Sequence, residues 1–214
     1  MEKKKRNAKV TKAKILKEAR TLFSKQGYDA TTVDDIGSAS GVNKALIYYY
    51  FQNKSGLYAE VMSELFDTIY EEIQKAAEGS QTVVAELEIF IASYTSYAYQ
   101  NPYFPALLLR ELSDSGAHLP DVMFTRMQRL FLLLSDILKR GESQKIFKKS
   151  IPILVHFMII GSLNLMVTTQ TLRTKAMLFD QSIDTCSQCT SDEVAKYIFE
   201  TIKKSLEPIT KEIK

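Results

Sequence analysis

The stretch of residues 41–58, GVNKALIYYYFQNKSGLY, carries side chains that are suited to binding a nucleic acid. Lys44 and Lys54 supply positive charge, and three consecutive tyrosines from Tyr48 onward supply hydroxyl groups that can donate hydrogen bonds to phosphate oxygens. Such contacts fix where a protein lies on a duplex, while side chains beside them can reach the edges of the bases. The stretch is therefore a candidate surface for binding a nucleic acid.

A second group with reactive side chains is the pair Cys186 and Cys189, the only two cysteines of the chain. A Cys-x-x-Cys pair can be a redox couple or half of a zinc site. Zinc would need His118 or His156, which are far away in the sequence, and there is no second such pair. We therefore expect no cofactor and no metal site, with a redox or metal role for the cysteines as an alternative.

Motifs of common enzymes are missing from the sequence. It contains no HExxH, no glycine-rich phosphate loop, no GxSxG and no cluster of carboxylates with histidine. Glu86 and Glu88 are two residues apart on an expected helix, so they do not share a face. We predict no catalytic residues and a protein that is not an enzyme; an enzyme that carries a DNA-binding segment is an alternative.

Three short helices are expected to position the side chains of residues 41–58. In the first, apolar residues recur at the spacing of one helical face after Thr11, which can cap its start. Gly27 is expected to end this helix, since glycine adopts the left-handed terminal conformation without steric penalty. Thr32 and Asp35 have the spacing of a capping box, which predicts the start of the second helix.

The third helix is predicted to follow a turn at Ser40-Gly41. At about 100° per residue, Ile47 and Phe51 share the face that would pack on the first two helices. Ala45 and Tyr49 point the opposite way, so the outer face is free to meet a base edge. This is the layout of a helix-turn-helix, whose third helix enters the major groove because only that groove is wide enough and distinguishes every base pair.

The remainder of the chain has a helical pattern almost throughout and no convincing alternating strand pattern. A long helix after residue 56 has an apolar stripe formed by Leu57, Val61, Leu65, Ile69 and Ile73. Further helices are expected at about 83–100, 102–112, 120–140, 151–174 and 191–206. We predict an all-α fold with an N-terminal three-helix DNA-binding helix-turn-helix domain, residues 1–56, and a larger helical domain for ligand binding and dimerisation, residues 57–214.

Residues 11–58 resemble the DNA-binding domain of the TetR family of bacterial transcriptional repressors. The resemblance rests on Phe23, Gly27-Tyr28, Thr31-Thr32-Val33, Ile36, Gly41-Val42, Tyr48, Phe51, Asn53-Lys54 and Leu57-Tyr58. It covers about the first quarter of the chain; the rest fits the family in length and helical content. That family often has glycine and threonine in place of Ala45 and Leu46, and alanine in place of Gly37, and the first two departures bear on which operator is bound.

The resemblance implies which side chains contact DNA. Those similar in place to residues that approach base edges or phosphates are Lys44, Ala45, Leu46 and Tyr48. Those that resemble positions holding the sugar-phosphate backbone are Thr32, Asn43, Tyr49, Tyr50 and Lys54. The alternative for the tyrosines is that they only pack against the protein, since amphipathic tyrosines are often half-buried.

The charge distribution agrees with a DNA-binding first quarter. Up to Gly56 the chain has twelve lysines and arginines and five acidic residues, a balance of +7, whereas the whole chain carries +3 and the remainder therefore −4. A basic segment joined to a mildly acidic body is typical of a phosphate-binding domain on an ordinary domain. Lys3 to Arg6 are expected either to form a solvated tail or to lie along the phosphates.

Two observations bear on the location of the protein. The N-terminus is basic but no apolar run follows it, so we expect no signal peptide. Residues 151–167 form the longest apolar stretch, which includes Pro152, His156 and Asn164 and falls short of the roughly 18–20 clean apolar residues of a membrane span. We expect a cytoplasmic protein with no membrane partner and a buried helix at this place.

The resemblance also implies two roles for the larger domain. The helices at 151–174 and 191–206 would pair with a second copy in a homodimer, which suits an apolar helix without a polar face and gives two DNA half-sites. The second role is binding of a small molecule by apolar side chains with a few polar groups. The candidates are Tyr94, Tyr97, Phe104, Met127, Phe131, His156 and Asn164. The alternative for each is an ordinary core position.

Together these features predict a dimeric, sequence-specific transcriptional repressor that a small, apolar effector releases from a palindromic operator. An effector-free regulator, an activator, or a redox-responsive regulator that uses Cys186 and Cys189 are the alternatives.

Overall fold

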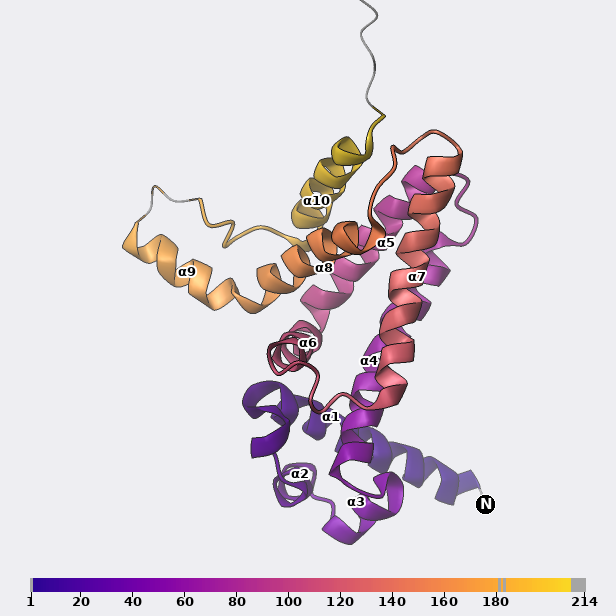
Figure 1. Cartoon of the computed structure of the whole chain (residues 1–214). Helices are drawn as coiled ribbons and strands as arrows, with labels where there is room; N and C mark the ends of the chain where they lie inside the picture. Colours follow the sequence, from indigo (N-terminus) through magenta and orange to yellow (C-terminus); the bar gives the residue numbers. More distant parts are fainter. Residues whose placement is uncertain (1, 181, 183, 209–214) are drawn as a thin grey trace, which may run out of the picture. The chain divides into compact units, whose positions relative to one another are not determined.

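The computed structural model describes residues 2–180, 182 and 184–208, and its regular elements there are all α-helices (Figure 1). The fold class is therefore the predicted one. The helices are α1 Glu2–Ala30, α2 Val33–Ser40, α3 Lys44–Phe51, α4 Lys54–Ala77, α5 Val83–Gln100, α6 Tyr103–Ser113, α7 Asp121–Ser143, α8 Pro152–Thr168, α9 Gln170–Phe179 and α10 Ser191–Leu206.

The described chain forms two compact units. Unit 1 comprises Met1–Asp67 and Ala106–Arg126, and unit 2 comprises Thr68–Pro105 and Met127–Lys214. Unit 1 thus extends beyond the predicted residues 1–56, partly because the Tyr58 hydroxyl donates a 2.5 Å hydrogen bond to the buried Glu111 carboxylate. The functional division after residue 56 stays a prediction.

The first helix begins earlier than predicted. Thr11 does not cap it but lies inside α1, where its hydroxyl donates to the carbonyl of Asn7 one turn earlier. A threonine inside a helix often makes this bond, so the residue type alone does not mark a start. The break at Gly27 is confirmed, since this glycine has a φ of 85° and a non-helical ψ. The side chains of Lys3 to Arg6 lie outside the described residues.

Caps define α2 and α3 as the sequence predicts. Thr32 and Asp35 form the capping box of α2, with the Thr32 hydroxyl accepting from the Asp35 amide at 3.1 Å. The pKa of Asp35 is lowered by its hydrogen bonds from the Thr32 side chain and backbone. Gly41 ends α2 with a φ of 61°, and Asn43 then caps α3 by accepting from the Leu46 amide at 2.8 Å.

A tight turn joins α3 to α4. Gln52 ends α3 in the left-handed region with a φ of 65°, which is uncommon for a residue with a side chain. The Asn53 side chain then accepts a 2.7 Å hydrogen bond from the amide of Gly56. A Cβ on Gly56 would lie 2.2 Å from the carbonyl oxygen of Phe51, so only glycine fits here. This close approach fixes the position of the end of α3 relative to the start of α4.

Aromatic side chains form the centre of unit 1. The ring of Tyr58 lies 4.8 Å from that of Phe23 and 5.1 Å from that of Tyr28. Burial, followed by the hydrogen bond to Glu111, raises the pKa of Tyr58. The imidazole of His118 stacks on Tyr28 at 4.6 Å, which ties the segment after α6 to the end of α1.

Unit 2 is built around α5, which packs against α8 and extensively against α10. Within this core, the Tyr94 hydroxyl donates a 2.9 Å hydrogen bond to the side-chain oxygen of Asn164, and both residues are buried. Burial raises the pKa of Tyr94. The predicted capping box of α10 is confirmed, because Thr190 and Glu193 exchange hydrogen bonds at its start.

Two expected helices of unit 2 differ from the structure. The helix expected to stop near Gly141 continues to Ser143: Gly141 keeps a negative φ, and the left-handed residue that follows the helix is Lys145, with a φ of 59°. The missing Cβ of Gly141 instead leaves room for the Phe147 ring. The helix expected to run to residue 174 ends at Thr168, and α9 begins at Gln170 after a bend of 66°. The hydroxyls of Thr168 and Thr169 both donate to carbonyls of the preceding turn at this bend, which favours a local distortion.

Among the described residues, no single helix is long and apolar enough to cross a membrane. The bent pair of α8 and α9 would meet that requirement only if the two helices were counted together, by length and composition.

Replacing Gly56 by alanine should destabilise the protein by about 2–4 kcal/mol, because the new Cβ cannot avoid a backbone oxygen. Ser55, the exposed neighbour of Gly56 in the first turn of α4, is the matched control. Its alanine variant should change the stability by no more than about 0.5 kcal/mol, as is usual for an exposed position. Denaturant unfolding measures both changes, and equal stability of the two variants would contradict the close approach at Gly56.

Candidate functional site

The outer face of α3 is the centre of the candidate DNA interface. Ile47 is 1% exposed and Phe51 5%, so these two side chains hold the helix against unit 1. Tyr49, on the opposite face, is 79% exposed and Tyr48 on the flank is 40% exposed. Ala45 is exposed as well. The face of α3 that was predicted to pack inward is therefore buried, and the face predicted to point outward is exposed.

Lys44 does not carry an isolated positive charge at this surface. Its ammonium group lies 2.6 Å from a carboxylate oxygen of Asp34 in α2 and 6.0 Å from the centre of the Tyr48 ring. The hydrogen bond to Asp34 is the main cause that raises the pKa of Lys44, so the side chain stays charged. An approaching DNA phosphate or base must compete with Asp34 for this ammonium group. The sequence alone does not reveal this pairing, because Asp34 and Lys44 lie on different helices.

Thr32 and Asn43 are exposed, and each already serves the fold as a helix cap. Free amide groups at a helix start favour an anion, so a phosphate can lie beside either cap while the side-chain oxygen keeps its amide partner. Beside Asn43 lies a hollow of about 340 Å³, which is lined by Asp34, Gly37, Ser38, Gly41, Val42, Asn43 and Lys44. Ser38 was not among the predicted contacts, and nothing in its residue type distinguishes it from a solvated helix position.

Lys54 has partners inside unit 1. Its ammonium group donates to the carbonyl of Tyr28 at 2.9 Å and lies 4.2 Å from the centre of the Tyr28 ring. It therefore stabilises the end of α1 as well as supplying charge near α3. Leu46 and Tyr50 are half-buried, and the Tyr50 ring lies edge-on to Tyr49 at 5.4 Å. The tyrosine run thus combines the outward and packing roles that the sequence left open.

The candidate effector-binding side chains of unit 2 form two groups. Tyr94, Tyr97 and Phe104 are buried, with ring centres of the two tyrosines 5.8 and 5.5 Å from that of Phe104, and Asn164 joins them through its bond to Tyr94. The second group contains Phe131 and His156. The first group has the packing of a core, whereas Phe131 and His156 are half-buried, and a binding role for either group stays a prediction.

His156 is the polar group of the second cluster. Its ring lies edge-on to Phe131 at 5.6 Å, and its Nδ1 atom is buried with no hydrogen-bond partner among the described residues. Burial lowers the pKa of His156 to about 4, so the imidazole is neutral near pH 7. Met127, the remaining candidate, is half-buried on α7.

The two cysteines are joined in the structure. Cys186 and Cys189 form a disulfide in the segment between α9 and α10. In the described part of the chain, no group of three or more His, Cys, Asp or Glu side chains is arranged to hold a metal ion.

Two family models match this sequence. Residues 15–61 match a model described as bacterial regulatory proteins of the tetR family, and residues 84–202 match one described as a tetracyclin repressor-like C-terminal domain. The first contains α2 and α3 with the caps described above. The second covers more than half of the chain.

Individual relatives agree with the models. The chain is 27% identical over 137 residues to the "Probable HTH-type transcriptional regulator YttP" of Bacillus subtilis, which covers 63% of this chain and 66% of that protein. It is 45% identical over 56 residues to the biofilm operon icaADBC HTH-type negative transcriptional regulator IcaR of Staphylococcus aureus, covering 26% and 30%. The chain thus spans less than two thirds of the length of either relative.

A solved structure shows the same fold. The transcriptional regulator FadR of Bacillus subtilis, in complex with stearoyl-CoA, superposes with a TM-score of 0.70 at 20% identity, covering 91% of this chain and 99% of that one.

Protonation of His156 should lower stability in acid. The folded-state pKa of about 4 lies below the ordinary histidine pKa of 6.5, so the unfolded chain takes up a proton that the folded chain does not as the pH falls from about 6.5 to 4. Between pH 7 and 5 this costs at most about 2 kcal/mol. In the His156→Gln variant the free energy of unfolding should fall less over that range.

The control for this pH dependence is His118→Gln. The His118 imidazole lies 3.2 Å from a carboxylate oxygen of Asp29 and 3.3 Å from one of Asp114, whereas the His156 imidazole lies beside the Phe131 ring. This variant removes the other histidine of the chain and keeps His156, so it should show the loss of stability in acid that His156 causes. An equal loss in wild type and His156→Gln would show that His156 is not the group responsible.

Asp34 should weaken DNA binding, because its carboxylate competes for Lys44 and repels phosphates. We expect Asp34→Asn to tighten duplex binding about threefold at low salt, and Lys44→Ala to weaken it about tenfold with a salt slope reduced by about one. Fluorescence anisotropy over a salt series measures both. Glu142→Gln, at an exposed position in unit 2, controls for net charge. If it tightens binding as much as Asp34→Asn, competition at Lys44 is refuted.

Proposed function

Because the chain belongs to the TetR family of bacterial regulatory proteins, we propose that it is a dimeric transcriptional repressor. In this proposal it binds a palindromic operator, and a small, apolar effector releases it. The observation that carries the proposal is the outward face of α3, which presents Ala45, Tyr48 and Tyr49 beside the charge of Lys44.

Operator binding follows from the size and chemistry of that face. An α-helix fits the major groove, where Ala45 and Leu46 can offer apolar contact to a thymine methyl group. Tyr49 can donate its hydroxyl to a phosphate, and Lys44 can supply charge to a base edge or a phosphate. The caps at Thr32 and Asn43 add amide groups that favour phosphates. The phosphate contacts would thus position the protein on the duplex, and the apolar contacts would give some preference for its base sequence.

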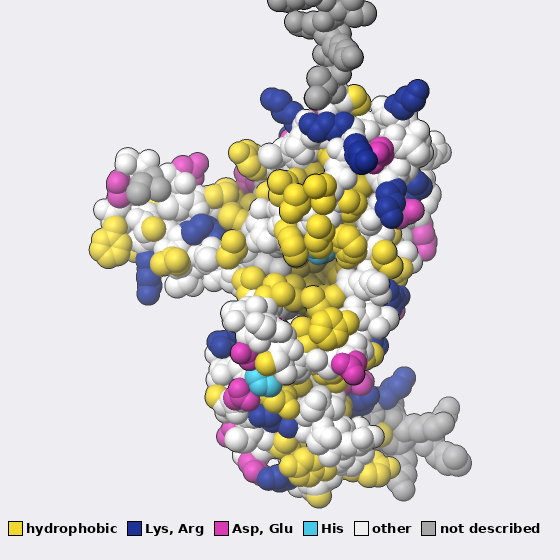
Figure 2. Space-filling model, viewed as in Figure 1, with side chains coloured by type: hydrophobic (Ala, Val, Ile, Leu, Met, Phe, Trp, Pro, Cys, Tyr) yellow, Lys and Arg dark blue, Asp and Glu magenta, His cyan; other side chains and the backbone are white. Residues whose placement is uncertain are grey.

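The proposed second copy is supported by the surface of α8. Leu154 is 50% exposed, Phe157 60%, Met158 55% and Leu165 54%, although α8 is one of the most apolar helices of the chain. Figure 2 shows hydrophobic side chains gathered over this part of unit 2. Each such side chain gains roughly 1.5–3 kcal/mol when it is fully removed from water, so a second copy of α8 is a suitable cover. Two copies also supply the two half-sites that a palindrome requires.

Effector control is supported by the FadR structure, which holds stearoyl-CoA in the same fold. For this chain we propose an apolar ligand bound among the aromatic side chains of unit 2, with Asn164 and His156 as polar groups. The ligand must bind more tightly to a dimer state whose recognition helices do not match the operator. Moving the population from 1:99 to 99:1 takes about 5.5 kcal/mol of differential affinity.

The other functions are less well supported. The relatives with printed functions are regulators, which favours a regulator over an enzyme. IcaR is a negative regulator, which favours repression over activation. We place the protein in the cytoplasm, where chromosomal DNA is found. An effector-free regulator would need no binding site in unit 2.

The test is selection of fragments of the source genome by the purified protein, followed by footprinting at several salt concentrations. We expect a near-palindromic site with two protected half-sites about one turn apart. Release of that site by long-chain fatty acids or their thioesters would identify the effector class. A variant with alanine at Lys44 and Tyr48 is the control and should recover no site. Sequence-independent, salt-sensitive binding alone would contradict a specific repressor.

A further inference from the structure

The segment between α9 and α10 contains a disulfide with open access. Cys186 and Cys189 are half-buried, and a hollow of about 380 Å³ lies beside them. Its lining residues are Met177, Asp184, Thr185, Cys186, Ser187, Gln188, Cys189 and Glu193. This space admits the thiol end of a small molecule, so the disulfide is within reach of a dissolved reductant.

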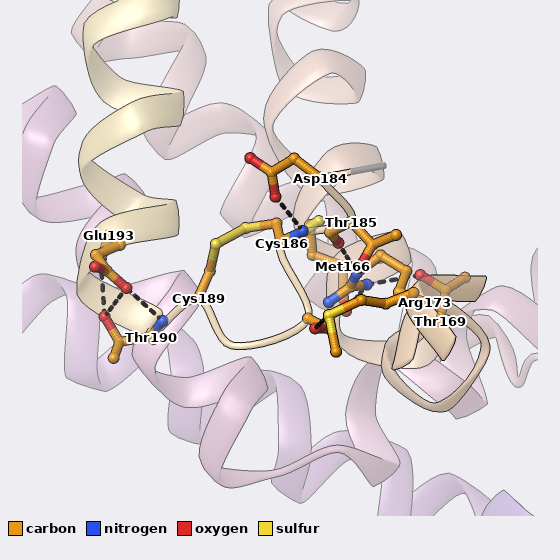
Figure 3. The surroundings of a disulfide bond; sticks show 11 residues. Met166, Thr169, Arg173, Asp184, Thr185, Cys186, Cys189, Thr190 and Glu193 are labelled. Atoms are coloured by element: carbon orange, nitrogen blue, oxygen red, sulfur yellow. Dashed lines mark hydrogen bonds between the residues drawn. A yellow bond between two sulfur atoms is a disulfide. The ribbon is translucent and has the colours of Figure 1, made fainter. Parts of the chain in front are cut away.

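The disulfide closes a turn that is anchored on both sides (Figure 3). On one side, the guanidinium group of Arg173 in α9 donates to the carbonyl of Thr185 at 3.0 Å and to the carbonyl of Met166 at 2.5 Å. On the other side, Thr190 begins α10 with its capping box to Glu193. The two cysteines lie between these anchors and bridge only three positions of sequence.

Cys186 has a backbone conformation that the turn imposes. Its φ is 51°, in the left-handed region that residues with a Cβ rarely adopt. Its amide donates to the Asp184 side chain at 2.9 Å, and its carbonyl accepts from the Cys189 amide at 3.3 Å. Without the disulfide, these two local bonds are the hydrogen bonds left at Cys186 itself among the described residues.

We propose that Cys186 and Cys189 form a reversible thiol–disulfide exchange site for low-molecular-weight thiols, and that reduction releases the turn between α9 and α10. A cytosolic disulfide is usually transient or redox-sensing, because the thiol pool there keeps cysteines reduced. The choice of an exchanging bond over a purely structural one rests on the proposed function, since a protein that binds chromosomal DNA works in that pool.

The exchange needs no group beyond the small thiol. Its thiolate attacks one protein sulfur, the bond between Cys186 and Cys189 breaks, and a mixed disulfide forms. A second small thiol attacks the small-molecule sulfur of this mixed disulfide and frees the protein thiolate. In total the protein gains two electrons and two protons, and two small thiols become one small disulfide. The reverse reaction with a small disulfide closes the bond again.

The structural consequence should be concentrated in α9. None of its residues is buried, and Phe179 at its end is 92% exposed. Among the described residues, its hydrogen bonds to the turn are the one from Arg173 to the Thr185 carbonyl and a 3.2 Å hydrogen bond from the Ser187 hydroxyl to the sulfur of Met177. By contrast, α10 has its own capping box and packs along α5, so it should keep its place.

The test uses the full chain in buffers of reduced and oxidised glutathione, with no DNA present. Trapping of free thiols followed by mass spectrometry should show both cysteines opening and closing together. Amide exchange of residues 170–180 and 184–189 should rise about tenfold on reduction, while that of α10 stays the same. The variant with serine at positions 186 and 189 should show the fast exchange under both conditions.

The proposal fails if the cysteines stay unpaired in oxidised glutathione, if the folded protein resists millimolar reduced glutathione, or if amide exchange does not change. Because the assay contains no DNA, each of these results leaves operator binding untouched. Loss of operator binding in the footprinting experiment would, in turn, leave the measured thiol exchange standing.

Discussion

The burial of Ile47 and Phe51 decides which side chains of α3 face outward, and the whole candidate DNA interface depends on it. With eight residues, α3 is too short to be a stable helix in isolation. Its two buried side chains, the Asn43 cap and the close packing of Gly56 against the end of the helix therefore fix its rotation. A short recognition helix is precise because the rest of unit 1 holds it, and its own helix propensity contributes little.

In unit 2, α8 has more apolar surface than the described core of the unit covers. Val155, Ile159 and Leu163 are buried against the unit, whereas Phe157 and Met158 are exposed. A helix that is apolar all round is ordinarily enclosed on every side. One face of α8 thus packs in the core of a single chain, and the opposite face is suited to contact with a second copy.

The sequence predicted best those features that depend on neighbours along the chain. Both capping boxes, the Gly27 break and the faces of α3 were predicted because a few residues of fixed spacing determine them. Features that depend on distant partners were missed, such as the pairing of Lys44 with Asp34 and the use of Lys54 to hold the end of α1. The prediction of Thr11 as a cap was wrong, and the bend between α8 and α9 was not predicted. In both cases a threonine hydroxyl can either cap a helix or donate to a carbonyl of its own helix.

On α3 and at the helix caps beside it, some side chains stabilise the fold and others do not. Asn43 and Thr32 hold helix ends, and Lys54 holds the end of α1, so changes there disturb the fold. Ala45 is exposed, and no hydrogen bond of the fold requires its side chain. In the proposed interface, gene duplicates of this chain can therefore change their target sequence at Ala45 at little cost in folding, while the proposed phosphate contacts stay the same.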